Sequence, residues 1–165
     1  HDLLDVPGAD LLPPIGQAAL QLATAKVSTS AEEARRLRYL RDRDGISLGR
    51  DLLLADAKAL ALGLARSGYR APRPPVLKAL GADGVATILI RIQGMVEGGF
   101  ASDHDALIAQ KIAHVLCGGA VAAGTDVAEA HFLALEKEAF LSLCGEEKSR
   151  ARMQAILTSG KPLRN

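Results

Sequence analysis

Apolar positions recur at helical spacing along most of the chain, and runs that alternate apolar with polar residues are almost absent. Leu53, Ala57, Leu60 and Leu64, for example, follow one another at intervals of three or four residues, which is typical of one face of an α-helix. Capping residues, glycines and prolines interrupt this pattern at intervals. Together these signals predict seven helices, at about 15–25, 31–38, 50–65, 83–96, 103–117, 126–144 and 146–158.

Side chains suited to the N-cap position stand at four of the predicted helix starts, and they are Ser30, Asp83, Ser102 and Thr125. Ser30 and Ser102 each precede an acidic residue by three positions, which is the spacing of a capping box. Glycines close the predicted helices, because they adopt the left-handed conformation that follows a helix at little steric cost. These glycines are Gly68, Gly98 and Gly99, Gly118 and Gly119, Gly145, and Gly160.

The only segment that favours a strand is 46–48, Ile-Ser-Leu, which follows a turn of sequence Arg-Asp-Arg-Asp-Gly. We therefore predict a mainly α fold with at most one very short strand. Prolines divide the chain further. We expect an extended arm at 1–14, a group of helices at 15–69, a Pro-rich linker at 70–82 and a carboxyl-terminal helical region at 83–165.

The composition is that of a folded protein without a strong electrostatic preference. The chain has 165 residues, of which 48% are hydrophobic, and its 20 basic and 19 acidic residues give a net charge of +1. This balance disfavours nucleic acid as a partner, and Asp42 and Asp44 interrupt the one arginine cluster that is suggestive of a helix-turn-helix. No apolar stretch reaches the roughly 18 residues of a membrane span. The two cysteines, Cys117 and Cys144, lie among apolar residues and favour free thiols in the cytoplasm.

The residues give no self-sufficient active site. His104 and Asp105 are adjacent at a helix start and point in different directions, while His114 and His131 lack a second ligand at helical spacing. The glycine-rich stretches follow no strand, so they do not fit a dinucleotide fingerprint. We expect no catalytic residue, no metal site and no cofactor in this chain. A basic carboxyl end is either a solvated surface or a site for a phosphorylated ligand, and it comprises Lys148, Arg150, Arg152, Lys161 and Arg164.

Two stretches resemble the crotonase (enoyl-CoA hydratase/isomerase) family. The sequence AKVSTSAEEARRLRYL at 25–40 is similar to the family signature in which a polar loop leads into an Ala-x-x-Ala helix. The carboxyl end resembles that of bacterial bifunctional β-oxidation proteins in which a crotonase module follows a 3-hydroxyacyl-CoA dehydrogenase. The matching runs are LEKEAFLSLCGE at 135–146, GKPLRN at 160–165, EGGF at 97–100, Ser102, HDALI at 104–108 and VLCGG at 115–119, so that the resemblance covers the chain from about residue 17.

The resemblance implies a parent enzyme that hydrates enoyl-CoA and oxidises 3-hydroxyacyl-CoA with NAD, acting in bacterial fatty-acid oxidation. The family's paired glutamates and NAD-binding glycines lie upstream of the matched segments, so no catalytic residue is carried over. It also implies that these helices pack against the crotonase core, the dehydrogenase module and neighbouring subunits. We therefore expect apolar faces to be exposed and the isolated chain to self-associate.

The resemblance further implies contact with CoA. Phe140 aligns with a phenylalanine that lies against the adenine in related hydratases, although plain core packing would also explain it. The matched basic position is occupied by Ser159, with Lys161 as a near neighbour. The family usually has glycine where this chain has Arg38, so the tight helix exit is either absent here or made by a strained non-glycine residue. The segment 72–119 is longer than in simple hydratases and is expected to add a helical layer.

A different interpretation is an independent helical oligomerisation or adaptor module. Such a module needs no missing partner, so it predicts a well-folded chain without exposed apolar patches. The parent-enzyme interpretation predicts the opposite. The two are therefore distinguished by the amount of apolar surface that the folded chain exposes.

Overall fold

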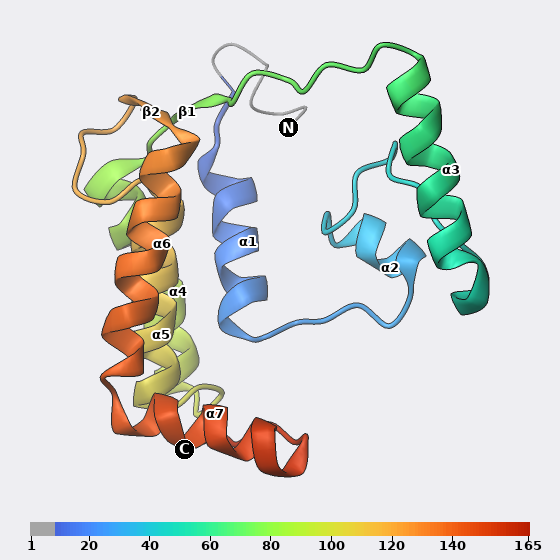
Figure 1. The fold of residues 1–165 in the computed structure, drawn as a ribbon. Coiled ribbons are helices and arrows are strands. Elements are labelled where there is room, and N and C mark those ends of the chain that lie inside the picture. The colour runs from blue at the N-terminus through green and yellow to red at the C-terminus, as the bar shows by residue number, and fades with distance from the viewer. Residues whose placement is uncertain (1–8) are drawn as a thin grey trace. The chain divides into compact units, whose positions relative to one another are not determined.

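The computed structural model describes residues 9–165, and in this range it confirms the predicted mainly α fold (Figure 1). Most of the predicted arm at 1–14 lies outside the described residues. Residues 9–165 form seven α-helices, one 3₁₀ turn and two short strands. Their bounds are α1 Leu12–Ala23, α2 Ala31–Arg36, η1 Arg50–Leu52, α3 Leu53–Arg66, β1 Val76–Lys78, α4 Gly81–Glu97, α5 Asp103–Leu116, β2 Asp126–Ala128, α6 Glu129–Cys144 and α7 Glu147–Ser159.

The chain forms two compact units. The larger unit comprises the chain up to Lys26 together with 74–165, and the smaller unit comprises 27–73. The first boundary therefore falls within the segment 15–69, which the sequence analysis treats as one group of helices. The second boundary, between Arg73 and Pro74, falls inside the Pro-rich segment 70–82. In the larger unit, α5 packs against α1, α4 and α6, and α7 packs against α6.

The core of the larger unit lies between α1, α4 and α5. Ala109 and Ala113 are one helical turn apart on α5 and are almost fully buried, and Ile88 and Ile92 have the same spacing on α4. The small alanine side chains let the neighbouring helix backbones approach closely, while the isoleucines fill the space between them. Ile112 and Leu116 of α5 are only half-buried beside this core.

The predicted strand at 46–48 is wrong. These residues form irregular structure, and Ser47 Oγ donates to Asp56 Oδ2 at 2.7 Å. The two strands that do form, β1 and β2, are antiparallel, with Leu77 opposite Val127. The backbone of 126–128 is therefore engaged in a strand pair that is distant in sequence. Thr125 consequently does not cap α6, which begins three residues later than predicted.

Two other helices begin earlier than predicted. α1 starts at Leu12 instead of Ile15, because Pro13 and Pro14 occupy its first turn, where the missing amide hydrogens have no intrahelical acceptor. α4 starts at Gly81, so that Asp83 lies within its first turn and is not its cap. The predicted cap of α5 is confirmed, since Ser102 and Asp105 form a complete capping box. Ser30 caps α2 as predicted, by accepting from the amide of Glu33.

The exit of α2 is made by a non-glycine residue in the left-handed conformation, which is the second of the two alternatives considered for Arg38. Arg38 has φ of 60°. Its amide donates to the carbonyl of Arg35 at 2.9 Å, and the next amide, from Tyr39, donates to the carbonyl of Ala34 at 2.8 Å. This is the Schellman arrangement, in which the residue after the C-cap is usually glycine. Ala25, with φ of 50°, occupies the same position after α1.

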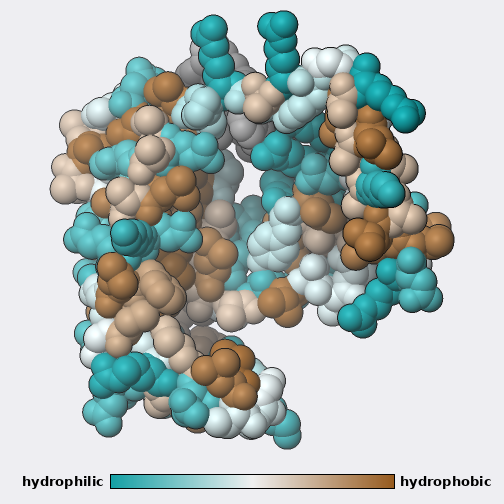
Figure 2. Space-filling view, viewed as in Figure 1, coloured by the Kyte–Doolittle hydropathy of each residue, from teal (hydrophilic) through white to brown (hydrophobic). Residues whose placement is uncertain are grey.

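The smaller unit buries very little. Its only buried apolar residue is Ala34, and α3 has no buried residue along its whole length. The apolar stripe predicted on α3, at 53, 57, 60 and 64, is therefore present but exposed. Figure 2 shows apolar side chains at the surface over α3 and, in the larger unit, over α6. Among the described residues, no helix has the length and apolar character needed to cross a membrane.

Replacing Arg38 with glycine should stabilise the smaller unit. We expect the free energy of unfolding to rise by about 0.5–1 kcal/mol, because relief of the left-handed strain outweighs the greater flexibility of glycine in the unfolded chain. Urea unfolding followed by tyrosine fluorescence measures this, since both tyrosines, Tyr39 and Tyr69, lie in this unit. The control Arg36→Gly, within α2, should lower stability by roughly 1 kcal/mol. A destabilised R38G variant would contradict the assignment.

Two glycines of α4 should respond in opposite ways to alanine. Gly94→Ala should raise the free energy of unfolding by about 0.5–1 kcal/mol, because no atom lies within 4 Å of the added methyl group and alanine favours the helix. Gly84→Ala should instead destabilise by about 1–3 kcal/mol, since its methyl group would collide with the side chain of Leu80 and lie 3.2 Å from Cys117 Sγ. Urea unfolding followed by circular dichroism checks both. Equal effects of the two substitutions would show that α4 does not pack here as described.

Candidate functional site

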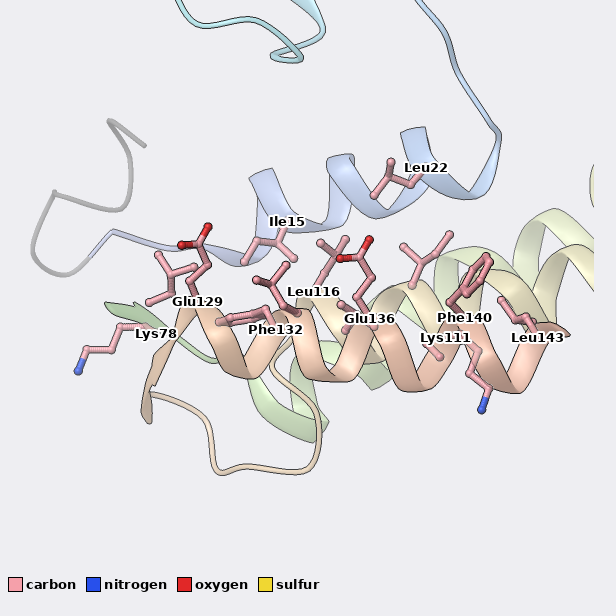
Figure 3. Close-up of a pocket in the computed structure, with 15 residues that line it drawn as sticks. Ile15, Leu22, Lys78, Lys111, Leu116, Glu129, Phe132, Glu136, Phe140 and Leu143 are labelled. Carbon is pink, nitrogen blue, oxygen red and sulfur yellow. The ribbon is translucent and has the colours of Figure 1, made fainter. Parts of the chain in front are cut away.

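An open groove of about 590 Å³ in the larger unit is a candidate site (Figure 3). α1 and α6 form its sides and α5 its floor, while β1 borders one end. Its lining is mostly apolar. The lining residues are Ile15 and Leu22 from α1, Leu77 and Lys78 from β1, Lys111, Ile112, Val115 and Leu116 from α5, and Glu129, Phe132, Leu133, Glu136, Ala139, Phe140 and Leu143 from α6.

The groove carries its charge along α6. In Figure 3 the carboxylates of Glu129 and Glu136 lie on the side of α6 that faces α1, whereas the ammonium groups of Lys78 and Lys111 point away from α1. Lys78 is neutralised by Asp126, with Nζ 2.7 Å from the carboxylate. Neither glutamate forms a salt bridge with a described residue. The groove is thus apolar inside and acidic along one edge.

The two residues implied in CoA contact are placed differently. Phe140 lines the groove and is 58% exposed, so the alternative of plain core packing does not describe it. Lys161 follows α7, does not line the groove, and has its amide bonded to Ser159 Oγ at 3.2 Å. The structure therefore presents an accessible aromatic ring in an apolar groove, but it does not assemble Phe140 and Lys161 into one pocket.

A polar cluster joins the start of α5 to α7 and to the end of the chain. Arg152 Nη1 lies 2.6 Å from Asp105 Oδ1, and Arg152 Nε donates to Asn165 Oδ1 at 2.8 Å. The Ser102 hydroxyl also donates to the main-chain oxygen of Asn165 at 3.0 Å. Partial burial by itself raises the pKa of Asp105, but hydrogen bonds from Ser102 and Arg152 and the arginine charge outweigh it. The pKa of Asp105 therefore lies below its ordinary value of 3.8.

The sequence did not reveal this cluster beyond its capping box. Arg152 lies 47 residues from Asp105, and sequence analysis placed it with a basic carboxyl end. Arg150 is also used internally, donating to the carbonyl of Gly145 at 2.7 Å and to that of Cys144 at 3.2 Å. Two of the five basic residues thus hold the fold together. This arrangement favours a structural role for the basic end over a single phosphate site.

His104 is the buried titratable group nearest this cluster. Its side chain is enclosed, with 5% of the residue exposed, and Nε2 lies 3.0 Å from Ser149 Oγ. Burial lowers the pKa of His104 below 6.5, and the positive charges of Arg152 and Lys148 lower it further. His104 is therefore neutral near pH 7 and serves to join α5 to α7. Its partner Ser149 is the other buried polar residue of the core.

The remaining candidate residues also have structural partners. His131 donates through Nε2 to the carbonyl of Gly118 at 2.9 Å. Cys117 is fully buried, which raises the pKa of its thiol to about 11 and makes it unreactive. Among residues 9–165, no three His, Cys, Asp or Glu side chains lie close enough together to hold a metal ion. Of the features described, the groove is therefore the best candidate for a binding site.

One curated protein provides a comparison. The chain is 49% identical over 144 residues to a protein of Bacillus subtilis (strain 168) described as "Probable 3-hydroxyacyl-CoA dehydrogenase". The match covers 87% of this chain but only 18% of that protein, so the chain spans about a fifth of the length of its relative. No family model and no solved structure matches the chain. The chain is therefore related to a region of this probable dehydrogenase, and in this chain the described residues are mainly helical.

The buried histidine makes stability sensitive to mild acid. Because the pKa of His104 is lowered on folding, the unfolded chain binds a proton more readily as the pH falls below about 6.5. We therefore expect the free energy of unfolding of the larger unit to decrease between pH 7 and 5.5. Urea unfolding followed by helical circular dichroism measures it, and a His104→Gln variant should lose much of this dependence. Asp105 titrates below 3.8 and leaves this window unaffected.

Proposed function

We propose that this chain is a helical packing region of a longer fatty-acid β-oxidation enzyme that combines 3-hydroxyacyl-CoA dehydrogenase with a crotonase-type hydratase module. The observation that carries the proposal is the 49% identity to a region of the probable dehydrogenase. The acyl-CoA substrate and the NAD cofactor belong to the whole enzyme. Within it, this region supplies packing surface and joins neighbouring modules or subunits in the cytoplasm.

The exposed apolar surface supports a packing role. Leu53, Leu60 and Leu64 on α3 are 57%, 59% and 40% exposed, and nothing within their own unit covers them. A stripe of this kind costs free energy in water unless another surface covers it. An independent adaptor module predicts a chain without such patches, so this surface favours the proposal. It also leads us to expect self-association of the isolated chain, which sedimentation would reveal.

Contact with CoA is the finer part of the proposal. The exposed ring of Phe140 is available to stack on an adenine, as its alignment with the hydratases implies. Lys161 follows the last helix and is exposed, so it is free to meet a phosphate. Both residues would act only together with the rest of the enzyme, since the groove that contains Phe140 does not contain Lys161.

A chimeric enzyme tests the proposal. We expect the Bacillus protein to retain NAD-dependent oxidation of 3-hydroxyacyl-CoA when its matched region is replaced by the corresponding residues of this chain, and to lose it when the region is deleted. The chimera carrying Leu60→Asp should lose activity, because the charge disrupts packing of the α3 stripe. Activity is followed as NADH absorbance.

Leu62→Asp is the matched control for the chimera, since this residue lies on the opposite face of α3 from the stripe, and it should leave activity near that of the chimera. A deletion variant as active as its parent would overturn the packing role, and so would a folded chimera without activity. Turnover of crotonyl-CoA by the isolated chain would also contradict the proposal, because no catalytic residue was carried over to it.

A further inference from the structure

The groove in the larger unit has the geometry of a helix bundle from which one helix is missing. α1 and α6 both pack on α5, but any direct packing between them is slight. The space above α5 therefore stays open, and Leu22, Leu133 and Phe140 at its edges are about half exposed. The groove follows α6 from Glu129 to Leu143, a length of about 21 Å at the rise of an α-helix. Its length suits three to four turns of a helix.

The lining residues repeat every seven positions. On α6, Phe132 and Ala139 form one such pair and Leu133 and Phe140 form another, while α1 contributes the pair Ile15 and Leu22. A seven-residue interval is two helical turns, which is the repeat with which side chains of one helix fit between those of another. Glu129 and Glu136 have the same spacing along the edge of the groove. In coiled coils, charged residues that flank an apolar seam select the partner by its charge.

We propose that the groove binds a single amphipathic helix whose apolar positions repeat every seven residues and are flanked by lysine or arginine. The helix belongs to polypeptide outside residues 1–165, so this inference rests on the proposed function. It adds to that proposal the chemical character of the surface that packs against this chain. The apolar side chains of the helix cover Phe132 and Leu133. Its basic residues pair with Glu129 and Glu136, which have no salt-bridge partner of their own among residues 9–165.

The charges argue against two other occupants. An acidic ligand, including a free fatty acid, would place its carboxylate near two glutamates that face the groove (Figure 3). A second copy of this chain offers α3 as its most exposed apolar helix, but α3 carries Asp56 directly beside its stripe residue Ala57. Like charges facing each other across an interface oppose association. Lysine or arginine residues beside the apolar positions therefore distinguish the proposed helix from an acidic ligand and from α3 of a second copy.

Two designed peptides test this inference with the purified chain. Both have three heptads with leucine at the a and d positions, and they differ only in having lysine or glutamate at e and g. We expect fluorescence anisotropy to show that the lysine peptide binds about tenfold more tightly at low salt, from two exposed charge pairs. The preference should shrink in 0.5 M NaCl. In the double variant Glu129→Lys/Glu136→Lys the preference should reverse toward the glutamate peptide.

A second pair of charge substitutions separates specific pairing from a general attraction of cationic peptides. The variant Glu97→Lys/Glu138→Lys makes the same change in net charge away from the groove, and it should keep the preference for lysine. Leu133→Asp should abolish binding of the lysine peptide, whereas Leu141→Asp, on α6 outside the groove, should leave it unchanged. Circular dichroism verifies that each variant folds.

Several results would overturn the inference. The first is absence of peptide binding, and the second is a preference for the lysine peptide that survives Glu129→Lys/Glu136→Lys. The third is a wild-type dimer that Leu133→Asp dissociates, because such a dimer would make a second copy of the chain the occupant of the groove. The peptide assay uses no other part of the enzyme. Its failure therefore leaves the chimera result intact, while an inactive chimera with peptide preference intact would refute the proposed function alone.

Discussion

The larger unit depends on the close approach of α1 and α4 to α5. Alanines at 109 and 113 remove the side-chain bulk that would hold these helices apart, and Ile88 and Ile92 then fill the remaining space. Cys117 continues the same face at the end of α5 and lies 3.2 Å from where a methyl group on Gly84 would be. The polar contacts of α5 follow from this position. Its start is fixed to α7 through Asp105 and His104, and its end is followed at once by Gly118, which accepts from His131 of α6.

Once α5 is enclosed by α1 and α4, only one side remains for α6. α6 packs there at a distance from α1, and the groove is the consequence. The smaller unit has no comparable centre, since Ala34 is its only buried apolar residue and its longest helix has none. Local hydrogen bonds define its turns, such as the bond from Arg35 to the carbonyl of Asp44 at 2.8 Å. Burial of apolar surface therefore stabilises the larger unit, whereas it contributes little to the stability of the smaller unit.

The sequence predicted what depends on neighbouring residues and missed what depends on distant ones. Helical periodicity and glycine positions located all seven helices, and the Ser102 capping box was identified because its partners are three residues apart. The strand pair was missed because β1 and β2 lie about 50 residues apart and neither has a strong pattern of its own. The groove could not be predicted for the same reason, since its lining comes from four elements. From the sequence alone, the glutamates of α6 could be identified only as charges on a helix. The positions of α1 and α5 show which side of that helix borders the groove.

Two parts of the larger unit differ in whether their charged side chains have partners. At one end Arg152 already donates to Asp105 and Asn165, and Arg150 closes the end of α6, so these cations have little left to offer a ligand. Along the groove the reverse holds, because Glu129 and Glu136 border apolar surface and form no salt bridge among residues 9–165. Burying that surface under an uncharged or acidic partner would desolvate the carboxylates without compensation. Covering it with a basic amphipathic helix would satisfy both the apolar and the charged requirement, so the part of the groove beside Glu129 and Glu136 favours a protein partner over an anionic small molecule.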